Sequence, residues 1–176
     1  MKQWEPSLFF RVCRFVLRVQ IILGLTIFCY RFFYGFWGVV ILLYFGWLIG
    51  LAGFVFFILG LYHLMKEGGA EKGESFLLTT VLVDSGIYSV VRHPEYLGSI
   101  MLILGSILVS QNLLTLLLGF PLLAWFVIYV LPVEDKDLLE KFGESYESYM
   151  KEVPSINFVV GVIRVLRYRK SGQVDE

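Results

Sequence analysis

The chain has 176 residues, no formal net charge, 57% apolar residues and a mean hydropathy of +0.73. Soluble domains have about 45–50% apolar residues, interrupted by charges, whereas residues 32–65 contain no Asp, Glu, Lys or Arg. Because about 20 such residues cross a bilayer, the composition excludes an ordinary soluble domain and predicts an all-α integral membrane protein.

The N-terminal part, residues 1–64, predicts a pair of transmembrane helices. The first covers residues 15–34, with Arg18 and Arg31 near its ends, where long side chains reach the headgroups. The second falls within residues 35–64. No small-residue cleavage site follows the first apolar run, so we expect a retained span rather than a removed signal peptide.

Small residues recur along the second predicted span. They either allow a neighbouring helix to approach closely or reflect the ordinary tolerance of glycine in lipid, and the sequence leaves the two readings open. They are Gly46, Gly50, Ala52, Gly53 and Gly60.

Residues 65–176 predict the catalytic region. A polar loop (66–75) and a short apolar segment (76–83) precede a turn at Asp84-Ser85-Gly86. The third span follows at residues 94–110 and the fourth at 113–131, for about four transmembrane helices in all.

The polar turn Gln111-Asn112 is so short that the third and fourth spans must form an antiparallel hairpin. A hairpin returns the chain to the face it left. We therefore expect Arg92-His93, before the third span, to lie near Glu134-Asp135, after the fourth.

Charged segments follow the hairpin. Residues 132–152 predict an amphipathic helix interrupted at Gly143, and residues 158–168 a second interfacial helix. Lysine and arginine counts place both termini and the candidate site on the cytoplasmic side. Beside apolar spans, these basic residues indicate a membrane face rather than nucleic-acid binding.

The stretch around Arg92-His93-Pro94 carries the candidate chemistry. Proline suits the first turn of a helix, and the free N–H groups of that turn favour an anion. Glu134 and Asp135 supply carboxylates for hydroxyl or ammonium groups. Tyr88 and Tyr96 offer flat faces on which a heterocycle can stack, and Gly98 leaves room for a ligand because it has no side chain. S-adenosylmethionine has a carboxylate, an ammonium, a sugar and a purine, and would use them all. The alternative is that Arg92 and His93 are interfacial anchors and that Glu134-Asp135 is a solvated helix start.

Other polar residues point to no further site. Cys13 and Cys29 read as small apolar residues, and two cysteines without a histidine cluster predict no metal site. His63, at the end of the second span, reads as an interfacial histidine rather than a catalytic one.

Two motifs resemble those of the isoprenylcysteine carboxyl methyltransferase and phospholipid methyltransferase family. The first is Ser85-Gly86-x-Tyr88-x-x-Val91-Arg92-His93-Pro94-x-Tyr96-x-Gly98. The second is Glu134-Asp135-x-x-Leu138-x-x-x-Phe142-Gly143-x-x-Tyr146-x-x-Tyr149. The resemblance covers about residues 77–161, nearly half the chain, and the two motifs bracket the predicted hairpin.

The resemblance implies an integral membrane methyltransferase that uses S-adenosylmethionine on a lipophilic or lipid-linked acceptor, such as an isoprenylcysteine carboxylate or a phospholipid amine. It implies catalytic roles for His93, Arg92 and Glu134. The cofactor site would be lined by Thr80, Val81, Leu82, Val83, Tyr88, His93, Pro94, Glu95, Tyr96, Gly98, Glu134 and Asp135. The partners it implies are this acceptor and membrane lipids.

The sequence departs from the family pattern twice. The usual Glu-Glu pair is Glu134-Asp135 here. The arginine that prenylcysteine enzymes carry about one turn earlier is missing, because residues 129–133 contain no cation. The resemblance therefore favours another lipophilic acceptor at least as much as a prenylcysteine carboxylate. Two other functions stay open: an NADPH-dependent membrane reductase related to sterol reductases, and a non-catalytic membrane scaffold.

Overall fold

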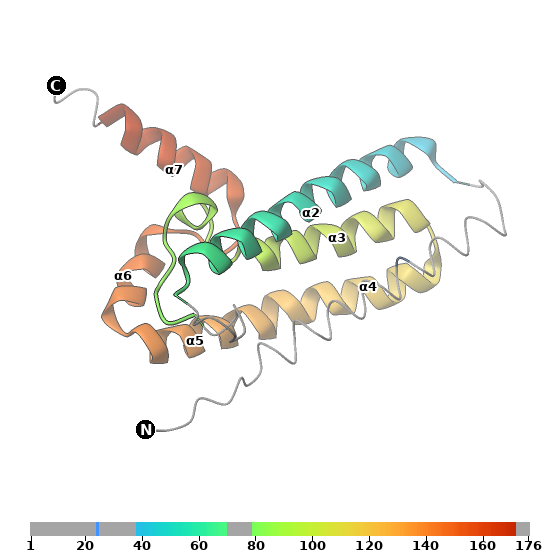
Figure 1. Ribbon diagram of the computed structural model, residues 1–176. Helices are drawn as coiled ribbons and strands as arrows, with labels where there is room; N and C mark the ends of the chain where they lie inside the picture. Colours follow the sequence, from blue (N-terminus) through green and yellow to red (C-terminus); the bar gives the residue numbers. More distant parts are fainter. Residues whose placement is uncertain (1–23, 25–37, 70–78, 172–176) are drawn as a thin grey trace. The chain divides into compact units, whose positions relative to one another are not determined.

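The computed structural model describes residues 24, 38–69 and 79–171 (Figure 1). The predicted first span, apart from residue 24, and residues 70–75 of the predicted polar loop lie outside them, whereas Lys66 and Glu67 of that loop belong to the helix α2. Within the described residues the chain is helical and has no strand, so the all-α prediction is confirmed there. The elements are α2 (Val40–Glu67), the 3₁₀ turn η1 (Gly86–Ser89), α3 (Pro94–Ser110), α4 (Leu113–Trp125), the π-helical η2 (Phe126–Val130), α5 (Leu131–Phe142), α6 (Glu144–Glu152) and α7 (Phe158–Ser171).

The described residues divide into two compact units that alternate along the chain. The first contains α2 up to Phe56 and the chain from Gly98 to Glu134. The second contains Phe57–Leu97 and the chain from Asp135 to the end of α7. The predicted division at residue 64 stays a prediction.

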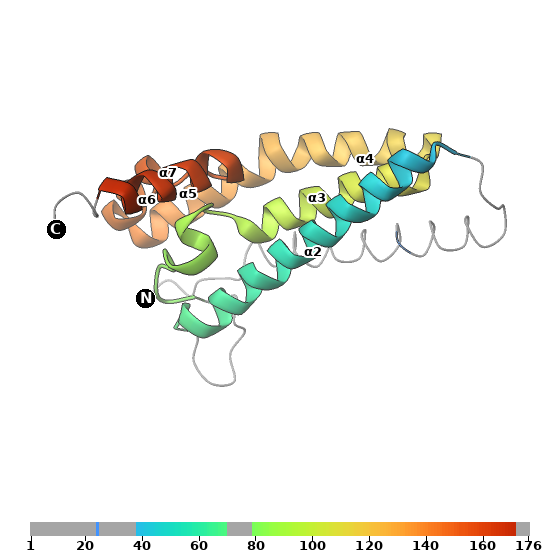
Figure 2. The same cartoon turned by 90° about the horizontal axis from the view of Figure 1, so that it is seen from above.

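In the first unit, α2 and α3 lie side by side (Figures 1 and 2), and glycines form their contact. A Cβ on Gly46 would lie 2.8 Å from the Val109 backbone and 2.9 Å from the Gly105 carbonyl. A Cβ on Gly53 would lie 2.8 Å from the Gly98 carbonyl. No side chain fits between backbones this close. The close-approach reading is thereby confirmed for these two positions.

The predicted turn between α3 and α4 is present and is fastened to the start of α2. The Gln111 side chain accepts a hydrogen bond from the Val39 amide at 2.7 Å and donates one to the Val39 carbonyl at 2.9 Å. Ser110 and Thr115 share a further hydrogen bond across the turn. Ile107 would touch any Cβ placed on Gly119, so α3 and α4 pack against each other as the predicted hairpin.

Two described helical stretches, Val40–Glu67 and Thr115–Phe142, are long and apolar enough to cross a membrane by length and composition. Large apolar side chains point outward from α2; Trp47, Leu48 and Leu51 are each more than 60% exposed. Such a surface suits lipid rather than water. α3 has 17 residues and is the shorter apolar helix. The four-span arrangement stays a prediction.

The predicted charged helix after the fourth span is present as α5, which begins at Leu131, but it continues the preceding helix without a break. The helix runs on from α4 through η2 into α5 and ends only at Phe142. Proline normally disrupts a helix, because it lacks an N–H and clashes with the preceding turn. Here the Leu131 amide bonds to the Phe126 carbonyl, five residues back. This wider π turn lets the helix continue through Pro132.

Glycine packing in the first unit can be tested with two alanine substitutions. Gly53→Ala would place a Cβ 2.7 Å from the Met101 Cβ, whereas a Cβ on Gly50 meets nothing within 4 Å. We expect Gly53→Ala to lower the unfolding free energy by about 1–3 kcal/mol through overpacking. Gly50→Ala should leave it unchanged or raise it, since alanine favours helix. Thermal unfolding of the purified protein in detergent measures both, and equal melting temperatures for the two variants would contradict the prediction.

Candidate functional site

The candidate site lies in the second unit, on the segment that leads into α3. Gly86 has a φ of +57°, which glycine adopts at little cost. It opens the η1 turn, in which the Tyr88 amide bonds to the Ser85 carbonyl at 3.0 Å. A Cβ on Gly86 would collide with the His63 ring. The predicted turn is thus present, and His63 packs against it.

Backbone hydrogen bonds hold Arg92 and His93 in place. The Arg92 amide donates to the Pro154 carbonyl at 3.0 Å, and the His93 amide donates to the Ser155 carbonyl at 3.1 Å. α3 then begins at Pro94, as predicted, and the Leu97 amide returns to the His93 carbonyl. The direction of both side chains is therefore set by the link between α6 and α7.

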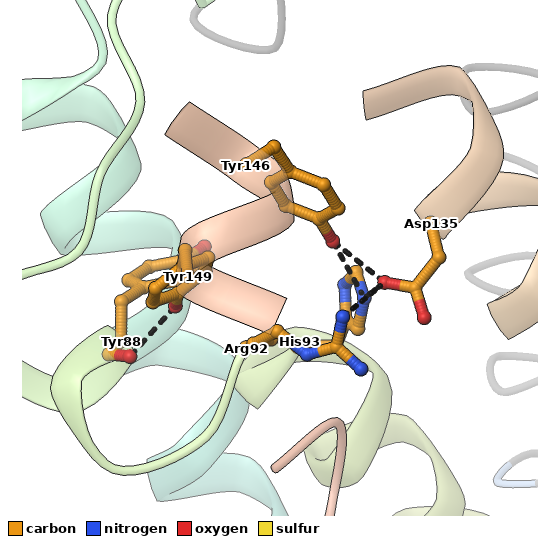
Figure 3. Close-up of polar contacts among 6 residues, drawn as sticks. All are labelled: Tyr88, Arg92, His93, Asp135, Tyr146 and Tyr149. Atoms are coloured by element: carbon orange, nitrogen blue, oxygen red, sulfur yellow. Dashed lines mark hydrogen bonds and ion pairs between the residues drawn. The ribbon is translucent and has the colours of Figure 1, made fainter. Parts of the chain in front are cut away.

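Three donors converge on one oxygen of Asp135 (Figure 3). Arg92 Nη1 lies 3.0 Å from Asp135 Oδ1, and His93 Nε2 lies 2.8 Å from the same atom. The Tyr146 hydroxyl donates to it at 2.6 Å. A carboxylate oxygen accepts, so His93 carries a proton on Nε2. We call these four residues the Asp135 network.

The Asp135 network is largely shielded from solvent. The side chains of Arg92, His93 and Asp135 are 9%, 2% and 17% exposed. Burying an unpaired charge is costly, whereas a paired and hydrogen-bonded one is tolerated. The Asp135 carboxylate thus allows the Arg92 guanidinium to stay charged in a nearly dry site.

The Tyr146 hydroxyl keeps its proton in this site, and it also lies 3.5 Å from His93 Nε2. Burial, and next the hydrogen bond to Asp135, raise the pKa of Tyr146 well above its ordinary value. Burial likewise raises the pKa of Tyr149, and nearby Glu95 adds to the effect. Both hydroxyls therefore keep their protons at any physiological pH.

A second set of contacts connects three other side chains. The Tyr149 hydroxyl donates to the Tyr88 carbonyl at 2.7 Å (Figure 3). The Tyr88 hydroxyl donates to Glu95 Oε2 at 3.0 Å. Tyr88 is 5% exposed and Tyr96 2%, so in this structure protein covers both predicted stacking faces.

The break at Gly143 places Tyr146 and Tyr149. Gly143 has a φ of +59° and separates α5 from α6, so the predicted interruption of the helix at this residue is confirmed. In α6, Tyr146, Tyr149 and Val153 then form a buried cluster. Packed against this cluster are Leu82, Leu138, Phe142 and Met150. Leu82 is the member of the predicted segment 80–83 that reaches this core.

The rest of segment 80–83 is tied to the end of α2. The Thr80 and Val81 amides both bond to the Gly68 carbonyl, at 2.8 and 3.2 Å. Val81 is 53% exposed, whereas Val83 is 6% exposed. The segment thus runs from the surface at Thr80 to the interior at Val83.

The predicted site residues divide between the two units. The second unit holds Thr80, Val81, Leu82, Val83, Tyr88, Arg92, His93, Pro94, Glu95, Tyr96 and Asp135, and the first holds Gly98 and Glu134. The predicted approach of the acidic pair to Arg92-His93 is confirmed for Asp135. Tyr146 was missed as a site residue. Its signal was its place in the second motif, three residues after Gly143, to which the sequence analysis assigned no role in the site.

Comparison with known proteins tests the resemblance. A family model described as phospholipid methyltransferase matches residues 42–145, more than half of the chain and most of the Asp135 network. The chain belongs to this family. No solved structure matches.

Three curated proteins show what else the chain is similar to. Protein-S-isoprenylcysteine O-methyltransferase of Schizosaccharomyces pombe is 37% identical over 57% of this chain and 45% of its own length. The Xenopus laevis protein of the same name is 35% identical over 57% of this chain and 33% of its own. Methanethiol S-methyltransferase of Pseudomonas deceptionensis is 33% identical over 38% of this chain and 24% of its own length. The chain thus spans less than half the length of each.

The Asp135 network predicts a strong stability effect. Asp135→Ala would leave Arg92 and His93 buried without their acceptor, which should cost about 3 kcal/mol of unfolding free energy. The matched control is Glu147→Ala, which removes a carboxylate from the exposed pair with Lys151. Denaturant unfolding of the detergent-solubilised protein checks this. Equal loss in the two variants would mean that the buried network adds nothing.

Tyr146 predicts a pH effect. Its pKa is raised in the folded chain, so its contribution to stability is complete below about pH 10, the ordinary tyrosine pKa, and declines as the pH rises beyond that. Tyr146→Phe should therefore flatten the fall of the melting temperature between pH 9 and 11. An unchanged slope in Tyr146→Phe would contradict this prediction.

Proposed function

We propose that this protein is an integral membrane methyltransferase that transfers a methyl group from S-adenosylmethionine to a small lipophilic or lipid-linked acceptor. The observation that carries the proposal is the Asp135 network, which joins both family motifs in one buried site. The family and the methyltransferase names of the relatives support the activity.

The side chains of the network fit the polar groups of the proposed cofactor. Arg92 Nε is buried and has no hydrogen-bond partner among the described residues. A buried guanidinium N–H needs an acceptor, and the carboxylate of S-adenosylmethionine is one. The second oxygen of Asp135 turns away from its three donors (Figure 3), where it can accept from an ammonium or a hydroxyl group. Glu134 and Gly98 remain predicted members of the cofactor site from the resemblance.

The chain's own part in the reaction is mainly positioning. S-adenosylmethionine would supply an electrophilic methyl group, whose transfer is an in-line displacement that needs alignment and a dry site. Asp135 holds Arg92 and His93 in one orientation, and Tyr146 closes the network on its other side. A thiolate or carboxylate acceptor needs no base. An amine must lose a proton, and His93 or Glu134 is the group proposed to take it.

The acceptor is proposed only as a class. The relatives are named for methyl transfer to an oxygen of an isoprenylcysteine and to the sulfur of methanethiol. Residues 129–133 of this chain carry no cation to meet a substrate carboxylate. We therefore propose a lipophilic acceptor that needs no carboxylate. It would reach the site from the bilayer, with both termini and the site on the cytoplasmic side.

The test is binding of labelled S-adenosylmethionine to the full chain in detergent. His93→Gln keeps a donor towards Asp135, so the fold should persist while the affinity falls about tenfold, equivalent to 1.4 kcal/mol. Glu134→Ala should weaken binding similarly if that residue contacts the cofactor. Glu147→Gln, on the exposed face of α6, should bind as wild type does.

Two outcomes would overturn the proposal. Binding of NADPH in place of S-adenosylmethionine would indicate a reductase, and binding of neither by the folded protein would indicate a scaffold. If S-adenosylmethionine binds, transfer of its labelled methyl group to thiol, amine and carboxylate lipids then identifies the acceptor atom.

A further inference from the structure

The C-terminal helix α7 has two unlike faces. Gly161 is buried on the inner face, where a Cβ would collide with the Val90 carbonyl. Arg164 reaches from the same helix to donate a hydrogen bond to the Ser89 carbonyl, and its Nη1 lies 3.9 Å from Glu152. The inner face of α7 is thus fastened to the η1 segment, four residues or fewer before His93.

The outer face of α7 is apolar and exposed. Val159, Ile163 and Leu166 are 66%, 45% and 60% exposed, and exposed Lys170 continues the row. Residues spaced by three and four lie along one side of a helix. In water such a stripe would be unfavourable, because its large apolar side chains would stay hydrated. The protein itself does not cover them, since α7 packs against the η1 segment with its other face.

The charges of α7 identify the occupant of this stripe. The helix sequence FVVGVIRVLRYRKS has four cations, three of them within its last five residues, and no acidic residue. Exposed Arg167 and Lys170 flank the apolar row and can extend their charged ends past it. An apolar face bordered by cations matches a bilayer surface with anionic headgroups. A second copy of α7 would instead bring like charges together.

We propose that α7 lies in the surface of an anionic lipid bilayer, and that this seating holds the segment carrying Arg92 and His93. The link is direct. α7 contacts Ser89 and Val90, and Pro154 and Ser155, which precede α7, accept hydrogen bonds from the Arg92 and His93 amides. Lipid binding by the outer face therefore stabilises the inner face and the site segment together. This inference depends on the fold of the second unit and not on the methyltransferase activity.

The seating is tested with a fluorescent label on the outer face. The full chain, with Cys13→Ser and Cys29→Ser, carries the label at Ile163→Cys or, as the matched control, at exposed Ser148→Cys on α6. It is placed in nanodiscs of phosphatidylcholine with or without phosphatidylglycerol. Nitroxide-bearing lipids should quench the Ile163 label several-fold more than the Ser148 label, and more so with anionic lipid. Arg167→Gln with Lys170→Gln should remove that dependence on anionic lipid.

Other quenching patterns would overturn the seating. Aqueous cobalt ions that quench the Ile163 label as fully as the Ser148 label would place the stripe in water. Protection from both quenchers would mean that protein, either a second copy or another partner, covers it.

The coupling to the site has its own measurement. Val159→Ser with Leu166→Ser changes only the outer face, so α7 should still fold against η1. In anionic nanodiscs, amide hydrogen exchange at Arg92 and His93 should become several-fold faster than in wild type, because their acceptors on Pro154 and Ser155 lose support. Unchanged exchange would refute the coupling even if the label shows α7 in lipid.

Discussion

A single carboxylate oxygen organises the second unit. Asp135 Oδ1 accepts from the adjacent residues Arg92 and His93 and from Tyr146 on α6, so it joins two separate parts of the chain to α5. Each donor is buried, so each would be destabilised by the loss of its acceptor. The position of α5, the direction of the segment before α3 and the packing of α6 therefore depend on one another through this atom.

The segment that carries Arg92 and His93 is held from two directions. Its side chains meet Asp135, while its amides meet the carbonyls of Pro154 and Ser155. A site fixed by both side-chain and backbone contacts loses little freedom when a ligand binds, which suits a reaction governed by alignment.

The first unit is stabilised differently. Its helices approach through glycines, with Gly46 against Gly105 and Gly53 against Gly98, and its outward side chains are large and apolar. Lipid offers no hydrophobic drive to bring helices together, so close backbone packing has to supply the attraction. Polar contacts also fasten the turn of this unit, where Gln111 and Ser110 bond neighbouring groups.

The sequence by itself determined the helices whose limits are local chemistry. Proline at a first turn predicted the start of α3 at Pro94, the polar pair Gln111-Asn112 predicted the following turn, and Gly143 predicted the break before α6. The two motifs also identified the family, since their residue types and order lie in the sequence itself.

Only the tertiary structure decided which carboxylate meets Arg92 and His93. Glu134 and Asp135 are neighbours about 100° apart around a helix, and either assignment satisfies the sequence. The π turn before Pro132 changes the direction in which the later residues of the helix face, and the sequence analysis did not predict it. The tertiary structure also placed Tyr146 in the site. Its spacing in the sequence is typical of one face of an amphipathic helix, and only the fold showed that its hydroxyl reaches Asp135.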